Sequence, residues 1–171
     1  TVPFGKLIHP RIEPEIALVM GEDLEGPDVT PAQAMAAVRW ALPALEVIDS
    51  RYQDFKFTLP DVIADNTSTA KAAVGSRAVP VEGLDLSTIG VVFLKNGEII
   101  TTAAGAAVLG DPAIALALLA NQLARRGMKL KAGDLIFTGA LTAATHVKPG
   151  DVVEARFSAL GSISLRVVDG E

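Results

Sequence analysis

Strand-like hydrophobic patterning dominates the first third of the chain, and one helix signal interrupts it. Residues 12–20 and 44–50 are mainly apolar and predict two strands. Between them, residues 30–33 (Thr-Pro-Ala-Gln) supply an N-cap, a proline at the first helical position and a capping-box glutamine. We therefore predict a helix over 31–42 that ends at Pro43 and contains the chain's only tryptophan.

The second half of the chain carries the strongest local signal, a β-hairpin. Two strand-like runs, 91–95 and 98–102, flank an Asn-Gly pair at 96–97 that favours a type I′ turn. A helix is predicted over 112–126, since it opens on a capping Asp-Pro pair and stops at a glycine. Three further strands are predicted over 135–138, 152–158 and 162–168. Because strand and helix do not alternate regularly, the pattern predicts an α+β fold with mainly antiparallel or mixed sheets and two main helices.

Composition limits the classes of function. The chain has 171 residues, half of them hydrophobic and 20% charged, which fits one globular domain rather than a disordered segment. A net charge of −5 without a basic cluster argues against a nucleic-acid partner, and no apolar run is long enough to span a membrane. The lack of cysteine excludes disulfides and thiolate metal sites and fits a cytoplasmic location. Because the chain begins with Thr1 rather than Met, we expect it to be a piece of a longer protein.

Two glutamates near the start of the chain indicate a metal site. Glu13 and Glu15 are two residues apart in the first predicted strand, so their carboxylates emerge from the same face. Glu46 lies in the second apolar stretch, where an isolated charge is costly to bury. Carboxylate oxygens suit a hard dication such as Mg²⁺ or Mn²⁺, which also relieves the repulsion between the acids. The alternative is that the pair forms the solvated face of its strand.

Two other polar segments interrupt apolar surroundings. One consists of Asp65, Asn66, Thr67 and Ser68. One interpretation is that Asp65 or Asn66 caps a short helix that runs through Lys71 to Val74, and such a helix N-terminus also offers backbone N–H groups to an anionic ligand. The other is Thr138-Gly139, which is either a plain turn or a place where backbone N–H groups approach a bound carboxylate.

The remaining candidate residues carry weaker signals. His9 and His146 are isolated, and we expect them to be structural or exposed. Lys56 is expected to be solvated. No glycine-rich phosphate loop, G-x-S-x-G elbow or dinucleotide fingerprint occurs in the sequence. The glutamates are therefore the strongest candidates for chemistry.

Five segments taken together resemble the 2-hydroxypentadienoate hydratase and 4-oxalocrotonate decarboxylase group of the fumarylacetoacetate hydrolase superfamily. These segments are residues 8–17, 43–51, 61–66, 105–107 and 133–140. The resemblance covers essentially the whole chain and implies the mixed β-sheet roll of that superfamily's C-terminal domain. It also implies that residues 1–171 are one metal-binding catalytic domain, roughly the C-terminal two thirds of a protein whose N-terminal region supplies a general acid/base lysine.

The resemblance also implies roles for individual residues. It implies that the metal, Mg²⁺ or Mn²⁺, is held by Glu13, Glu15 and Glu46. It implies that the substrate pocket contains Asp65, Asn66, Ser68, Thr138 and Gly139. Relatives commonly have alanine where this chain has Thr67, and this departure would crowd the pocket.

Within the group, two segments favour the decarboxylase branch. Residues 49–61 resemble that branch, as does the His-Pro-Arg lead-in at 9–11. The implied reaction is the metal-dependent decarboxylation of 2-oxohex-3-enedioate to 2-hydroxypenta-2,4-dienoate, a step in the meta-cleavage of aromatic compounds. Arg51 then either faces the leaving carboxylate or forms an ion pair with Asp49 or Asp54.

Two other functions stay open on sequence grounds. A hydratase would add water to 2-hydroxypenta-2,4-dienoate with the same metal site. Alternatively, the chain is a non-catalytic subunit, since the hydratase and decarboxylase of this group are known as partners. A carbon–carbon hydrolase is a weaker alternative, because it needs a base to activate water and no histidine is obviously placed for it. The expected partners are a 2-oxo acid, the pathway hydratase and further copies of the chain, with neither nucleic acid nor membrane.

Overall fold

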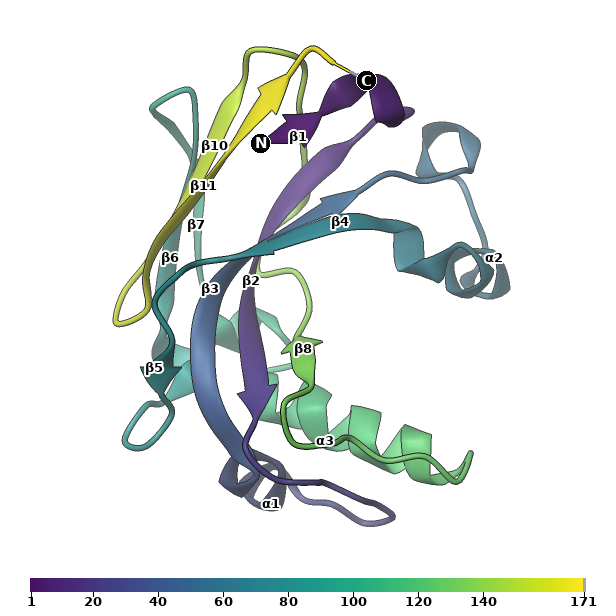
Figure 1. The fold of residues 1–171 in the computed structure, drawn as a ribbon, viewed down its shortest axis with the longest axis vertical. Coiled ribbons are helices and arrows are strands. Elements are labelled where there is room, and N and C mark those ends of the chain that lie inside the picture. The colour runs from purple at the N-terminus through teal and green to yellow at the C-terminus, as the bar shows by residue number, and fades with distance from the viewer. Residues whose placement is uncertain (171) are drawn as a thin grey trace.

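Two β-sheets make up most of the computed structural model, which describes residues 1–170 (Figure 1). The first sheet has five strands in the order β1-β11-β10-β6-β7. They are β1 (Val2–Pro3), β11 (Gly161–Val168), β10 (Val152–Phe157), β6 (Gly90–Lys95) and β7 (Glu98–Ala104). The second sheet follows the path β4-β3-β2-β8, with β5 paired to β3 and β9 paired to β2. Its strands are β4 (Thr69–Val74), β3 (Val38–Ile48), β2 (Arg11–Met20), β8 (Leu135–Phe137), β5 (Val79–Pro80) and β9 (Thr145–His146).

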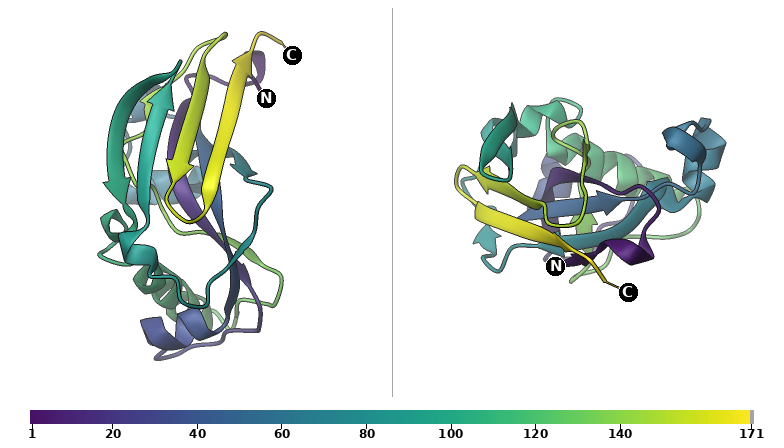
Figure 2. Two further views of the ribbon diagram at one scale, coloured as in Figure 1. Left: turned by 90° about the vertical axis from the view of Figure 1, so that its left-hand side faces the viewer. Right: turned by 90° about the horizontal axis from the view of Figure 1, so that it is seen from above.

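Helices lie at the margins of the sheets. In Figure 1, α3 (Pro112–Ala124) crosses the lower end of the second sheet beside α1 (Pro31–Ala36), whereas α2 (Leu59–Ala64) stands on the loop between β3 and β4. The two ends of the described chain lie close together because β1 pairs with β11 (Figure 2). Short 3-10 turns occur at Phe4–Lys6, Gln53–Phe55, Asn66–Ser68, Leu86–Thr88 and Gly105–Ala107. Within residues 1–170, every helix is too short or too polar to cross a lipid bilayer.

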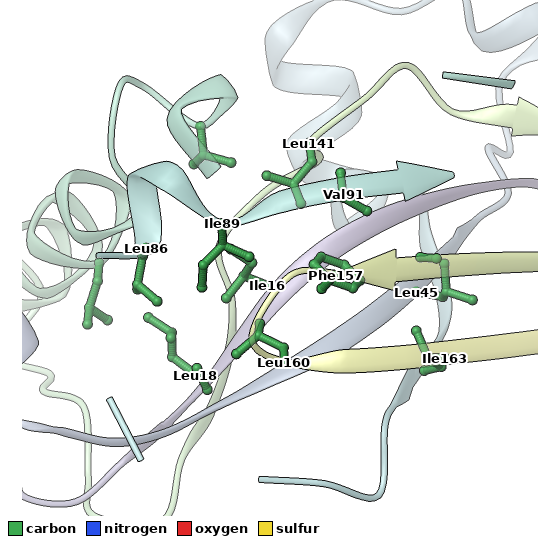
Figure 3. Packing of buried hydrophobic residues seen from close by; sticks show 14 of the residues in the cluster. Ile16, Leu18, Leu45, Leu86, Ile89, Val91, Leu141, Phe157, Leu160 and Ile163 are labelled. Carbon is green, nitrogen blue, oxygen red and sulfur yellow. The ribbon is translucent and has the colours of Figure 1, made fainter. Parts of the chain in front are cut away.

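The hydrophobic core lies between the two sheets. Ile16 on β2 and Leu45 on β3 point from the second sheet toward Phe157 at the end of β10, and all three are buried (Figure 3). Alternate residues of β2 take part in this packing, so the residues between them face the other way. One face of the second sheet is thus fixed by the core. Its opposite face carries Glu13 and Glu15.

Much of the predicted element order is confirmed. The hairpin of β6 and β7 turns through Asn96 and Gly97, both with positive φ (54° and 85°), as a type I′ turn requires. The helix predicted over 112–126 is α3, with the Asp111 side chain capping the Ala113 N–H. One mixed sheet and one antiparallel sheet, with few helices, make the α+β roll that was expected.

The helix predicted over 31–42 is wrong beyond its first turns. The capping box of Thr30 and Gln33 does begin a helix, but α1 ends at Ala36 and β3 begins at Val38. From there β3 runs antiparallel to β2 over almost its whole length. Long-range pairing with a buried strand therefore overrides the local helix signal.

Pro43 lies inside β3 and does not end an element. A proline cannot donate a hydrogen bond to a neighbouring strand. Its carbonyl accepts from the Gly75 N–H, so its nitrogen faces the same side of the strand. On that side the neighbouring chain passes from β4 to β5, and the ladder is interrupted. The missing donor falls at this gap, which lets the strand continue.

The short helix expected through Lys71 to Val74 is also absent, because Thr69–Val74 form strand β4. β4 pairs with β3, and Ala72 lies opposite Glu46. Before it, Asn66–Ser68 form a tight turn in which every residue has positive φ. Capping therefore does not explain the polar cluster at 65–68.

Candidate metal centre

The register of β2 and β3 brings the three glutamates together. Glu13 lies directly opposite Glu46, and Glu15 is two residues further along the same face of β2. Each glutamate offers one carboxylate oxygen, and these oxygens lie within 4.8 Å of one another. Glu15 is only 2% exposed, while the other two are half-buried. The structure thus joins two sequence segments into one cluster of acids.

The electrostatics of this cluster favour a bound cation. Burial raises the pKa of Glu13 to about 7, with the charge of Glu46 and a hydrogen bond to it as further causes. Burial also raises the pKa of Glu15 to about 8, against the opposing effect of the Gly139 N–H. No ion pair to a Lys, Arg or His is formed by these acids within residues 1–170. An all-carboxylate set of this kind fits a hard divalent ion such as Mg²⁺ or Mn²⁺.

Two neighbouring groups orient the carboxylates. The Gly139 N–H donates to Glu15 Oε2 at 2.8 Å, and Thr69 Oγ1 donates to Glu46 Oε1 at 2.5 Å. Gly139 has φ +118°, a conformation that side-chain-bearing residues rarely adopt. Thr138 Oγ1 donates to the Ile16 carbonyl at 2.9 Å and so ties this turn to β2. The predicted Thr138-Gly139 segment therefore lies at the acid cluster.

Asp65 is occupied by protein partners. Its Oδ2 accepts from Ser50 Oγ at 3.2 Å and from the Arg51 N–H at 3.1 Å. Arg51 Nε donates to Asp65 Oδ1, and a terminal nitrogen of Arg51 donates to the Asp65 carbonyl. The ion pair of Arg51 is thus with Asp65 and not with Asp49 or Asp54. Another terminal nitrogen of Arg51 donates to the Asp49 carbonyl at 2.8 Å, so this arginine clamps the end of β3 to the turn at 65–68.

That turn is strained and holds an unsatisfied hydroxyl. Asn66, Thr67 and Ser68 have φ values of 52°, 52° and 63°, and residues other than glycine adopt this region at a cost of about 1–3 kcal/mol each. Ser68 is 2% exposed, yet its Oγ has no hydrogen-bond partner in the described part of the chain. Asn66 is exposed, and its amide makes one long hydrogen bond, at 3.4 Å, to the Thr69 carbonyl. Strain and an orphaned polar atom beside the acid cluster are features of a functional site.

Sequence reasoning missed a cluster around the Phe55 ring, which includes His9 and Arg11. It lies at the Glu13 end of the acid cluster, whereas Gly139 lies at the Glu15 end. The His9 ring stacks on Phe55 with ring centroids 4.8 Å apart, and the Arg11 guanidinium lies 4.1 Å from the Phe55 ring centroid. His9 is therefore partly buried and structural, while His146 is exposed, as expected of isolated histidines. Lys56 is exposed, as predicted. Only the alternation of Arg11 with the glutamates on β2 could have signalled this cluster.

Comparisons with known proteins agree with this fold. The family described as fumarylacetoacetate (FAA) hydrolase C-terminal matches residues 2–168. A 4-oxalocrotonate decarboxylase from Pseudomonas putida is 50% identical over 98% of this chain and 63% of its own length. A 2-keto-4-pentenoate hydratase from Paraburkholderia xenovorans (strain LB400) is 40% identical over 95% of this chain and 61% of its own length.

A solved structure shows the same backbone. It is the 4-oxalocrotonate decarboxylase from Pseudomonas putida G7, complexed with magnesium and adipate, with a TM-score of 0.94 and 47% identity. The match covers 98% of this chain and 64% of that one, so the chain spans less than two thirds of the length of these relatives. The fold of this chain and the family match over residues 2–168 assign it to the same family. The chain belongs to the fumarylacetoacetate hydrolase C-terminal family.

Proposed function

We propose that this chain is the metal-binding domain of a decarboxylase that converts 2-oxohex-3-enedioate (4-oxalocrotonate) to 2-hydroxypenta-2,4-dienoate. The observation that carries the proposal is the cluster of Glu13, Glu15 and Glu46, whose oxygens lie within 4.8 Å of one another and form no ion pair with a basic side chain of residues 1–170. The 50% identity to a 4-oxalocrotonate decarboxylase supports the choice of reaction. Mg²⁺ or Mn²⁺ is the cofactor that suits these ligands.

The reaction needs an electron sink at the keto group. The C5–C6 bond breaks and CO2 leaves. The electron pair of that bond forms C4=C5, the C3=C4 pair shifts to C2=C3, and the C2 oxygen takes up a proton. Bound by the three glutamates, the dication supplies a Lewis acid for the keto-acid head of the substrate. Gly139 and Thr69 hold Glu15 and Glu46 in fixed orientations, so little reorganisation is needed during reaction.

The five predicted pocket residues divide into two groups. Asp65, Thr138 and Gly139 use their polar groups in hydrogen bonds within the protein, and these hydrogen bonds position the site. Ser68 has a buried hydroxyl without a partner, and Asn66 has an exposed amide. We therefore assign direct substrate contact to Ser68 and Asn66.

The hydratase is the second candidate, because hydratases 40% identical to this chain share the fold. The same acids would then serve the addition of water to 2-hydroxypenta-2,4-dienoate. We also propose self-association and pairing with the pathway hydratase. Exposed apolar side chains on α2 and α3, Leu59, Ile63 and Leu118, support such contacts.

The test is an assay of the full-length encoded protein on both substrates. Glu13→Gln and Glu46→Gln should each abolish Mg²⁺-dependent CO2 release while the fold is retained by circular dichroism. Glu98→Gln is a matched control, since Glu98 is exposed on β7 in the other sheet. Full activity in EDTA would end the proposal, and water addition without CO2 release would replace it with the hydratase.

A further inference from the structure

Arg11 lies next to the glutamates on the same strand. It is two residues before Glu13 in β2, so its side chain leaves the sheet on the face that carries the acids. Residues two apart on a strand are separated by about 7 Å. That spacing is comparable with the distance between the two carboxylates of an extended six-carbon chain. A six-carbon dicarboxylate anchored at the acids is therefore long enough to extend along the strand to the position of Arg11.

The charge of Arg11 is not neutralised by the protein. No ion pair joins its guanidinium to a carboxylate within residues 1–170, and its Nε is buried without a hydrogen-bond partner. Two other basic side chains nearby already form ion pairs, Arg51 with Asp65 and Lys95 with Asp151. Burial and the positive charge of Arg11 lower the pKa of the neighbouring His146. Within the described part of the chain, Arg11 thus has no carboxylate partner of its own.

Phe55 holds this guanidinium in place. The ring lies 4.1 Å from the Arg11 carbon at the guanidinium centre, within the range of a cation–π contact. Phe55 and Asp54 adopt positive φ values of 56° and 54°, a conformation that is unusual for a bulky residue. The His9 ring stacks on Phe55, and its Nε2 is buried without a partner. Arg11 and His9, each with a buried nitrogen that has no hydrogen-bond partner within residues 1–170, therefore both contact the Phe55 ring.

The opposite end of the acid cluster is apolar. Opposite and beyond Glu15, the same face of the sheet carries Ala44 and then Ala17 and Leu42, which are buried together. A carboxylate placed there would lose hydration without gaining a partner. The face is thus asymmetric, with a cation at one end of the acids and hydrocarbon at the other.

We infer that Arg11 binds the second carboxylate of a dicarboxylic 2-oxo acid whose keto-acid head lies at the three glutamates, and that it thereby selects dicarboxylates over monocarboxylates. This assignment rests on the proposed function. It adds the residue that recognises the second carboxylate of the substrate. A charge-assisted hydrogen bond from a guanidinium to a carboxylate is among the stronger polar contacts in proteins. Stacking on Phe55 keeps the planar group oriented before the ligand arrives.

The test compares two ligands that differ only at the far end. 2-Oxoadipate carries the second carboxylate, whereas 2-oxohexanoate ends in a methyl group. Both are saturated, so the keto group is not conjugated to C5 and binding is measured without turnover. Dissociation constants are measured by calorimetry on the full-length encoded protein with saturating Mg²⁺, for the wild type and for Arg11→Met, Arg11→Lys and Phe55→Leu.

We expect the wild type to bind 2-oxoadipate at least about tenfold more tightly than 2-oxohexanoate. Arg11→Met should lose this preference and keep its affinity for 2-oxohexanoate within about twofold, which also shows that the variant is folded. Arg11→Lys should retain part of the preference, and Phe55→Leu should reduce it by a smaller factor.

Three outcomes overturn the assignment, and they are distinguishable. If Arg11→Met keeps the wild-type preference, another group binds the far carboxylate. If it weakens both ligands equally, Arg11 only supports the loop that carries Phe55. If the wild type binds neither ligand with Mg²⁺ present, the proposed function has failed and the assignment falls with it.

Discussion

At the scale of single residues, the site places mutually repelling carboxylates beside Arg11, an arginine that forms no ion pair within residues 1–170. Glu13, Glu15 and Glu46 face one another across two strands, and Arg11 lies one step beyond Glu13 on the same face. Burial makes the ionised acids costly until a cation joins them. The cluster is therefore built to gain stability from a dication, and this dependence can be measured.

The response of stability to pH and Mg²⁺ follows from the raised pKa values. In the folded chain the pKa is about 7 for Glu13 and about 8 for Glu15, against 4.5 for the free side chain. The folded state thus holds more protons than the unfolded state between these values, and without a dication the contribution of these acids to stability falls as pH rises through that window. Because Mg²⁺ binds the ionised forms, the increase in Tm caused by Mg²⁺ should be larger at about pH 8 than at about pH 6.

Thermal unfolding in Mg²⁺ and in EDTA checks this prediction. The double variant Glu13→Gln with Glu15→Gln should lose the Mg²⁺ response at both pH values, whereas the exposed Glu98→Gln should keep it. An equal Mg²⁺ effect at both pH values would mean that these two acids do not lose protons to the solvent when the metal binds.

At the scale of elements, the site depends on how β3, the turn at 65–68 and β4 are joined. The guanidinium of Arg51 holds the end of β3 to Asp65, and Thr69 at the start of β4 reaches Glu46. The sequence predicted strands around the glutamates, because stretches of mainly apolar residues are a local signal. It did not predict the turn, since three successive residues with positive φ are maintained only by tertiary contacts such as this clamp.

A double-mutant cycle measures the clamp between Arg51 and Asp65. Asp65 is buried but the Arg51 side chain is 45% exposed, so solvent screening limits the coupling energy to about 1 kcal/mol. Arg51→Gln and Asp65→Asn should therefore be less damaging together than the sum of their separate effects on the free energy of unfolding in urea. Strict additivity would show that the pair does not hold the turn.

At the scale of the whole molecule, the packing of one sheet on the other fixes which face is free for chemistry. The inward residues of β2 and β3 meet those of β10 and β11, which leaves the glutamates on the opposite face (Figure 3). The α+β class, the hairpin and α3 could be predicted because their signals are local. The helix predicted over 31–42 failed because pairing of β3 with β2 is decided by distant residues.

Removing a core ring tests this arrangement. Phe157 lies between the sheets and is 6% exposed, so Phe157→Ala should lower the free energy of unfolding by about 3–5 kcal/mol. Urea denaturation measures the loss, with Phe57→Ala as control because Phe57 is 37% exposed on a loop and should cost much less. Equal losses for the two variants would contradict the position of the core between the sheets.

The most direct measurement is anomalous X-ray diffraction from crystals of the full-length encoded protein soaked in Mn²⁺. We predict one strong anomalous peak in contact with the carboxylates of Glu13, Glu15 and Glu46, and its loss in crystals of Glu46→Gln. A peak elsewhere, or no peak at these three carboxylates under conditions in which the full-length encoded protein shows Mn²⁺-dependent CO2 release, would contradict the account.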